Sequence, residues 1–381
     1  MKNYLTSIMW MMCFVAISVT ASAQITPTGA DFDGNPLQTA VPFLRLSPEA
    51  QAGGMGDAAL ATDPDANAVF WNTAKLPFTD EDGGLAVSYT PWLAGLDVDD
   101  IHLINAGGFI KTGDDLGAFN FAVRYFSLGE TEFRQTQLDP GVVQNPQEFA
   151  LQGGYSRKLG ETTGIGVNLK YINSDLASGQ VSNGNTVEDG TAVAGDIQFY
   201  FDPLNAGVAD WSFAAGITNI GSKISYLENS DEKDFLPTNL GIGTNVAFSV
   251  SETSKVSFAL DANKLLVPTP ENIGDASFKN DGVIEALFSS FGDAPDGGSE
   301  ELREVQVSVG GEYNYDDKFF ARSGFFYEHE DKGNRQYATL GAGARMQNIG
   351  VANFAYMFAT NNSNSPLDGT LRFSLEFDIN K

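Results

Sequence analysis

Strict alternation of apolar and polar residues recurs in short segments from about residue 85 to the end of the chain. In residues 119–125 (FNFAVRY), bulky apolar side chains alternate with Asn, Ala and Arg, and residues 371–379 (LRFSLEFDI) repeat the pattern most cleanly. Successive side chains of a β-strand point to opposite faces, so each such segment predicts a strand with one apolar and one polar face. The chain is therefore expected to be all-β, with the apolar face covered by a core or by lipid.

The spacing of these segments distinguishes a membrane barrel from a soluble sandwich. The expected strands lie near residues 85–89, 101–111, 119–126, 149–155, 165–171, 193–201, 211–217, 240–248, 256–260, 305–309, 319–325, 337–340, 351–356 and 371–379. The connections alternate between short turns (for example 112–116 and 158–162) and mostly longer loops (for example 127–147 and 264–304). Short turns on one side and long loops on the other are typical of outer-membrane barrels. We predict a transmembrane antiparallel β-barrel of about fourteen strands, formed by residues 84–381.

The first 23 residues have the features of a secretory signal peptide. Lys2 precedes an apolar stretch from Ile8 to Val19, and residues 21–23 (ASA) form a small-residue cleavage site, so we expect cleavage after Ala23. The apolar stretch is short for a membrane anchor. Beyond it, no run of apolar residues reaches the length of a transmembrane helix. Export combined with alternating strands predicts integration into the cell outer membrane.

Two segments depart from the strand pattern. Residues 24–83 are rich in Gly, Ala, Asp and Pro, with helix-like pieces near 47–52 and 67–76, and we expect them to form a hatch or plug inside the barrel rather than a disordered tail. The long loop 264–304 contains apolar residues at helical spacing between Gly282 and Gly292. Either this helix packs on its own barrel rim, or it is a docking surface for a partner. The partner-binding residues predicted there are Ile284, Leu287, Phe288 and Phe291.

The sequence offers little for catalysis, metal or cofactor binding. The only cysteine, Cys13, lies in the signal peptide, and the two histidines are His102 and His329. Residues 63–67 have carboxylates at calcium-loop spacing, but the glycine and the final glutamate of that loop are absent. Residues 97–100 could hold a loop calcium, although a solvated acidic loop explains them as well. We expect no enzyme activity, no metal and no cofactor. The formal net charge of -27 argues against nucleic-acid binding.

The N-terminal part of the expected hatch carries a recognisable motif. Residues 43–57 (FLRLSPEAQAGGMGD), followed by 63–67 (DPDAN) and 70–72 (FWN), resemble the PorV family, a branch of the FadL-like barrel superfamily. Residues 265–270 (LLVPTP) and 289–295 (SSFGDAP) are similar to the long loop of the same family. Residues 72–74 read NTA, so the proline usual in the superfamily is missing here.

The resemblance implies a function that the residues alone do not give. PorV-like proteins are outer-membrane components of the Bacteroidetes type IX secretion system. They associate with its giant translocon barrel, bind the C-terminal signal domains of secreted cargo and pass cargo to a surface attachment complex. Two alternatives remain open at this point. One is a FadL-like channel for hydrophobic small molecules, which requires an apolar pocket between hatch and wall. The other is a lipid hydrolase using His102.

Overall fold

The computed structural model describes residues 35–93, 100–113, 116–134, 141–182, 185–203, 209–228, 233–271, 277–346, 350–361, 365 and 367–379. All of them lie in one compact unit, Gly34–Lys381, which is distinct from Met1–Asp33. The predicted signal peptide and its cleavage site after Ala23 therefore lie outside the described residues. Within the part of the chain described, no helix is both long enough and apolar enough to span a membrane.

The described residues form a closed barrel of fourteen antiparallel strands, which confirms the predicted fold class. Strand β1 pairs with β2 on one side and with β18 on the other, from Gly83 opposite Ile379 to Tyr89 opposite Phe373. Closure leaves no strand edge unpaired, as a bilayer requires. The barrel strands are β1 (Gly83–Pro91), β2 (Ile101–Lys111), β3 (Gly117–Leu128), β6 (Gln147–Lys158), β7 (Thr163–Asp175), β10 (Gly190–Phe201), β11 (Ala209–Gly221), β12 (Asn239–Ser251), β13 (Ser254–Leu265), β14 (Gln306–Tyr315), β15 (Phe319–Tyr327), β16 (Gln336–Met346), β17 (Gly350–Ala359) and β18 (Leu371–Ile379).

The alternation read from the sequence places bulky apolar side chains on the outer wall. In β18, Phe373 and Leu375 are 45% and 42% exposed, whereas the alternating residues Arg372, Ser374 and Glu376 are buried inside the barrel. Water-filled or packed interiors accept polar side chains, while the lipid-facing surface is apolar, so this arrangement is that of a membrane barrel. These outward side chains are exposed in the isolated chain. In the membrane, lipid covers them.

Two strands depart from the expected facing. In β17, Val351 is buried on the inward face, unlike Phe354. The second is β16. Residues 337–340 are expected to form a single apolar strand segment, but Tyr337 and Thr339 point into the barrel and only Leu340 points outward. Both inward side chains bind the hatch: the Tyr337 hydroxyl donates to Asp57 at 2.6 Å, and the Gly56 N–H donates to Thr339 at 2.9 Å. Tyr337 and Thr339, which were expected on the same face as Leu340, therefore face inward, where the hatch contacts the wall.

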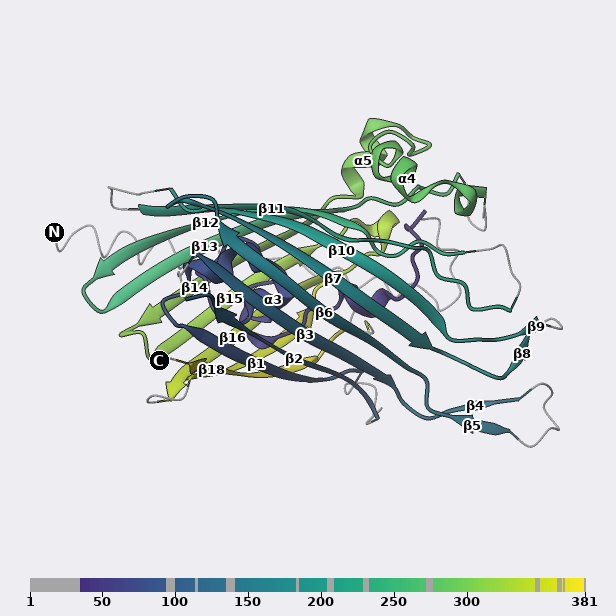
Figure 1. Cartoon of the computed structure of the whole chain (residues 1–381), viewed down its shortest axis with the longest axis horizontal. Coiled ribbons are helices and arrows are strands. Elements are labelled where there is room, and N and C mark those ends of the chain that lie inside the picture. The colour runs from purple at the N-terminus through teal and green to yellow at the C-terminus, as the bar shows by residue number, and fades with distance from the viewer. Residues whose placement is uncertain are drawn as a thin grey trace. The chain divides into compact units, whose positions relative to one another are not determined.

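The connections differ at the two ends of the barrel. The turns between β12 and β13 and between β14 and β15 are short, and they lie at the end where the C-terminus is found (Figure 1). The opposite end carries long loops with two small hairpins that the sequence did not predict. These hairpins are β4–β5 (Thr131–Phe133 and Val142–Gln144) and β8–β9 (Val181–Ser182 and Asn185–Thr186). In outer-membrane barrels short turns face the periplasm, which assigns the long loops to the outside.

Residues 35–82, which precede β1, form a hatch inside the barrel (Figure 1). Its elements are η1 (Pro42–Arg45), α2 (Ala50–Gly53), α3 (Ala68–Trp71) and η2 (Thr73–Phe78). Helix α2 contacts β16 to β18, α3 contacts β2 and β3, and η2 contacts β3, β6, β7 and β10. At Gly54 a Cβ atom would lie 2.8 Å from the Gly341 Cα, so hatch and wall meet backbone to backbone and need glycine there.

Candidate partner-docking site

The longest described connection at the outer end joins β13 to β14, and we call its described residues, 266–271 and 277–305, the loop platform. It contains η4 (Ser277–Asn280), α4 (Val283–Ser289) and α5 (Gly298–Arg303), and α4 and α5 stand outside the barrel wall in Figure 1. Helix α4 lies within the predicted helix of residues 282–292 but ends earlier, where Ser290 caps it. Helix α5 is not predicted by the sequence pattern.

One face of α4 is fixed on an apolar cluster. Ala286 is fully buried, and Val283 packs beside it against Phe235, Leu265 and Val267. These partners come from the loop after β11, the end of β13 and the start of the platform itself. Because the cluster joins three chain segments, burial of its apolar surface holds α4 in one orientation on the rim.

The other face of α4 carries exposed apolar side chains. Ile284 is 64% exposed, Phe288 is 75% exposed and Phe291, just beyond the helix, is 53% exposed. The fourth residue predicted for partner binding, Leu287, is half-buried. Leu302 on α5, which was not predicted, is 76% exposed. We call Ile284, Phe288, Phe291 and Leu302 the apolar surface of the platform.

A buried ion cluster clamps α5 to the barrel. Glu304 is fully buried; Lys264 of β13 binds one of its carboxylate oxygens, and Lys332 Nζ lies 3.1 Å from the other. The Thr269 hydroxyl donates to Glu304 at 2.7 Å, and Lys332 also pairs with Glu300 at 2.5 Å. Burial raises the pKa of Glu300, but hydrogen bonds from Lys332 and from a backbone N–H outweigh it and leave the pKa below its ordinary value of 4.5.

A second ion cluster lies at the rim beside the platform. Glu328 accepts hydrogen bonds from Arg335 at 2.7 and 3.0 Å, from Arg45 of the hatch at 3.1 Å and from Gln306 at 3.0 Å. Burial raises the pKa of Glu328, but the hydrogen bond and charge of Arg335, with the charge of Arg45, bring it below its ordinary value. Charged groups thus join the hatch to the rim, and Gln306, which directly follows the platform, donates to the same carboxylate.

A lysine side chain contacts the segment directly before α4. Lys223, in the loop after β11, donates to the backbone carbonyl of Lys279 at 2.8 Å and to that of Asp281. Its ammonium group lies 4.0 Å from the centroid of the Phe235 ring, within range of a cation–π contact. The platform is therefore attached at both helices, which makes its apolar surface a fixed feature of the outer end.

The space between hatch and wall is small and polar. A cavity of about 140 Å³ lies there, and charged and amide side chains dominate its lining. Arg124 crosses it to donate to the carbonyl oxygens of Leu44 at 2.9 Å and Leu46 at 2.6 Å. Ligand pockets for small molecules usually measure about 300–1,000 Å³ and are mostly apolar. This cavity does not match the apolar pocket that a hydrophobic channel requires.

The two histidines have contacts of their own. The His102 ring packs 5.9 Å from Tyr89 and 6.4 Å from Tyr125, at the outer start of β2. His329 caps a short 3-10 helix through the Asp331 N–H at 3.2 Å. Asp97 and Asp99 lie outside the described residues. Within the part that is described, no group of three acidic or histidine side chains is arranged to hold a metal ion.

The barrel is closed, its outer wall is apolar and its lumen holds the hatch. The short turns lie at the end where the first strand begins and the last strand ends. These features define an integral outer-membrane β-barrel protein. The family model described as "Type IX secretion system protein PorV" matches residues 30–272, well over half of the chain. The chain belongs to this family and is an outer-membrane component of the type IX secretion system. The match includes the hatch motif and residues 265–270, so the resemblance of these segments is confirmed, whereas residues 289–295 lie beyond it.

Solved structures with the same fold are distant in sequence. The toluene transporter TbuX of Ralstonia pickettii has a TM-score of 0.51 and 11% identity, over 88% of this chain and 99% of its own. The TodX deltaS2S3 mutant, a monoaromatic hydrocarbon channel, has a TM-score of 0.51 and 13% identity, over 87% and 99%. A Pseudomonas aeruginosa FadL homologue has a TM-score of 0.45 and 12% identity, over 91% and 99%. Among curated protein sequences, none matches this chain. The two structures with a TM-score of 0.51 show that this chain shares the barrel fold of these transporters.

Proposed function

We propose that this protein binds the C-terminal signal domains of secreted cargo at the giant translocon barrel of the type IX system and passes them to the surface attachment complex. The match to the type IX family over residues 30–272 is the observation that carries the proposal. The proposed mechanism is binding and transfer, without covalent chemistry by the barrel itself.

The loop platform supports this proposal by its position and its chemistry. Ile284, Phe288 and Phe291 are exposed apolar side chains at the outer end, the side on which the proposed function places the secreted cargo. Aromatic side chains contribute much of the binding energy of protein interfaces, and a fixed backbone lowers the entropy lost on association. The buried pairs of Glu304 with Lys264 and Lys332 supply that fixed backbone.

Replacement of the apolar surface in living cells tests the proposal. A strain lacking the gene is complemented with wild-type protein or with the variant Phe288→Asp/Phe291→Asp. We expect the gene deletion to trap type IX cargo in the periplasm, and the double variant to restore secretion poorly because charged side chains weaken apolar association. Cargo is measured in cell-surface and periplasmic fractions, and the tagged barrel is isolated in mild detergent to detect co-purified translocon and cargo.

The hairpin β4–β5 provides a matched control. Val142 and Val143 are 50% and 52% exposed on another outer loop, so Val142→Asp/Val143→Asp introduces the same charges away from the platform. This control should secrete normally. Normal surface cargo in the deletion strain contradicts the proposed function itself. Normal secretion by the platform variant contradicts only the choice of surface.

A channel for hydrophobic small molecules is the second candidate. A cavity of about 540 Å³ at the outer end favours it, because Leu37, Trp92, Met357 and Leu367 contribute to its lining. The charged side chains of Arg45, Glu328, Lys332, Arg335 and Arg372 line the same cavity, and the small polar space beneath it argues against a continuous apolar path. Loss of hydrophobic-substrate uptake on deletion, with cargo secretion intact, would favour the channel.

A further inference from the structure

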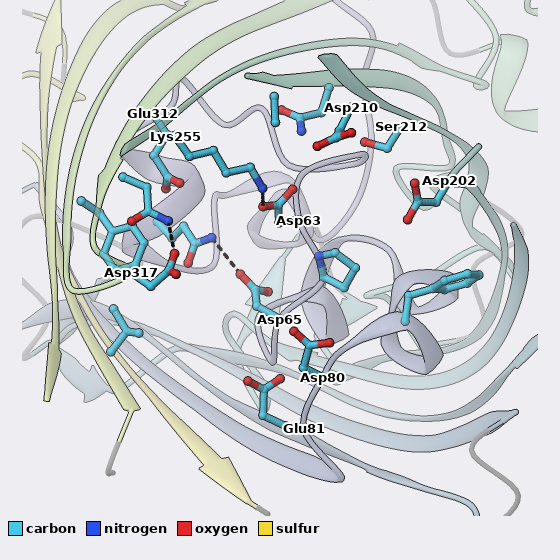
Figure 2. A pocket seen from close by; sticks show the side chains of 18 of the residues that line it. Asp63, Asp65, Asp80, Glu81, Asp202, Asp210, Ser212, Lys255, Glu312 and Asp317 are labelled. Atoms are coloured by element: carbon cyan, nitrogen blue, oxygen red, sulfur yellow. Dashed lines mark hydrogen bonds and ion pairs between the residues drawn. The ribbon is translucent and has the colours of Figure 1, made fainter. Parts of the chain in front are cut away.

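A wide acidic cavity lies at the opposite end of the molecule from the loop platform. We call it the periplasmic vestibule: it has a volume of about 780 Å³ and lies between the hatch and the short-turn ends of the strands. Eleven carboxylate side chains and three basic side chains line it. Figure 2 shows the carboxylates of Asp80, Glu81, Asp202 and Asp210 around this space.

The three basic side chains are already paired within the vestibule. Lys255 binds Asp63 at 2.5 Å, Arg322 binds Glu312 at 2.6 Å and Arg345 binds Asp378. Asp80, Glu81, Asp202 and Asp210 form no ion pair among the described residues, so they leave a net negative charge facing the cavity.

Burial and mutual repulsion act on these unpaired carboxylates. Burial, with the charges of Asp63 and Asp210, raises the pKa of Asp202, which lies in the turn after β10. Burial likewise raises the pKa of Glu81, and the charges of Asp378 and Asp80 add to the effect. A positive charge that approaches either carboxylate therefore stabilises its ionised form.

A buried amide in the vestibule wall points to a ligand that can donate hydrogen bonds. Asn245 of β12 is only 2% exposed and lines the cavity. Its Oδ1 atom has no hydrogen-bond partner. Buried polar atoms are normally satisfied, and leaving one unsatisfied costs stability. Its neighbour across the strand pair, Ser212, is by contrast satisfied, since its hydroxyl donates to the Ala61 carbonyl at 2.6 Å.

The spread of the carboxylates favours an extended cation over a metal ion. Within the described residues, no three acidic or histidine side chains converge as metal ligands. The rings of Phe78, Tyr200 and Trp211 lie in the same lining as the carboxylates. Lysine and arginine carry long aliphatic stems that pack on apolar surface while their charged ends reach polar groups. A cavity combining dispersed carboxylates, aromatic rings and a free acceptor suits several such side chains at once.

We propose that the periplasmic vestibule binds a basic peptide segment, rich in lysine or arginine, of a periplasmic partner protein. Charge complementarity at such a surface accelerates association and excludes acidic competitors. The proposal concerns the end of the barrel away from the cargo-docking surface, and it does not depend on the proposed cargo function.

The experiment uses the full-length protein purified in an uncharged detergent and a fluorescein-labelled octalysine peptide. Binding is followed by fluorescence anisotropy at low and at physiological salt. We expect octalysine to bind with an affinity that falls as salt rises, and an octaglutamate peptide not to bind. The variant Asp202→Asn/Asp210→Asn should weaken binding about three- to tenfold, since exposed charge pairs contribute modest energies individually.

Two carboxylates in turns at the same end, outside the vestibule lining, give a matched control. Glu252 lies in the turn between β12 and β13, and Asp316 lies in the turn between β14 and β15. The variant Glu252→Gln/Asp316→Asn changes the net charge equally and should bind octalysine like the wild type. Asn245→Ala, which removes the unpartnered acceptor, should weaken binding without changing the net charge.

Three results would overturn the proposal. The first is absence of octalysine binding by wild-type protein whose circular dichroism shows a folded barrel. The second is an equal loss of affinity in the vestibule and control variants, which indicates attraction to the overall charge alone. The third is saturable binding of calcium chloride alone that displaces octalysine at constant ionic strength, which identifies a metal site instead.

Discussion

In the hatch, Asp57 Oδ1 lies 3.2 Å from Nη1 of Arg372 in β18, so an ion pair joins the hatch to the last strand. The side chains are 11% and 3% exposed. The Tyr337 hydroxyl of β16 donates to the other carboxylate oxygen at 2.6 Å. Three segments that are distant in the sequence therefore meet at a single carboxylate, which ties hatch seating to barrel closure.

Loss of this carboxylate charge should loosen the hatch. Asp57 has φ 66°, a conformation that asparagine tolerates, so Asp57→Asn removes the charge with little backbone strain. The buried Arg372 guanidinium then loses its counter-charge, and we expect destabilisation of about 2–4 kcal/mol. Thermal unfolding in detergent and protease cleavage of residues 35–82 measure it. Asp316→Asn is the control, because Asp316 also has positive φ but lies in an exposed turn; equal effects of the two changes contradict the assignment.

Close backbone packing predicts that a single methyl group will displace the hatch. A Cβ on Gly324 of β15 would lie 2.1 Å from the carbonyl carbon of Met55, whereas one on Gly311 of β14 would lie 3.5 Å from the Phe258 ring. Gly324→Ala should therefore cost about 1–3 kcal/mol through overpacking, and Gly311→Ala should be nearly neutral. Thermal unfolding of the two variants side by side tests this. Similar melting of both proteins would show that the hatch yields without cost.

The barrel could be predicted well from the sequence because the alternation of apolar and polar residues, with a period of two, is a local property of each strand. Prediction of facing was wrong at Tyr337 and Thr339, since their inward positions depend on hydrogen bonds to hatch residues 280 or more positions away. Helix α5 was missed for a related reason. Residues 298–303 (GSEELR) have no apolar stripe, and the helix is fixed by ion pairs of its acidic side chains with Lys264 and Lys332. Contacts between residues so far apart in the sequence produce no local periodicity from which the helix could be predicted.

The buried cation of the platform clamp gives a third prediction. Lys332 is 6% exposed and pairs with Glu300 and Glu304. Lys332→Met keeps most of the side-chain volume but leaves these carboxylates short of a partner, which costs about 3–5 kcal/mol for a buried pair. The cost falls on the attachment of α5, so protease cleavage within residues 277–305 should accelerate while the barrel melts as before. Lys318→Met, at an exposed turn lysine, is the control and should leave cleavage unchanged.

Acidification should release the same platform. The pKa values of Glu300 and Glu328 lie below the ordinary 4.5 because their cationic partners outweigh the effect of burial. A carboxyl group whose pKa is lower in the folded state stabilises the fold above pH 4.5 and loses this contribution as pH falls through the folded value.

The platform should therefore stay ordered from neutral pH down to about pH 4.5 and become mobile below it. A spin label on Ser299→Cys, an exposed position of α5, reports this motion by electron paramagnetic resonance. Mobility should rise as pH falls from 5 to 3 while circular dichroism of the barrel remains constant. In Glu300→Gln, one titrating group of the clamp is removed, so mobility at neutral pH should be higher and the pH response smaller. An unchanged spectrum down to pH 3 would show that the clamp does not depend on these ionised carboxylates.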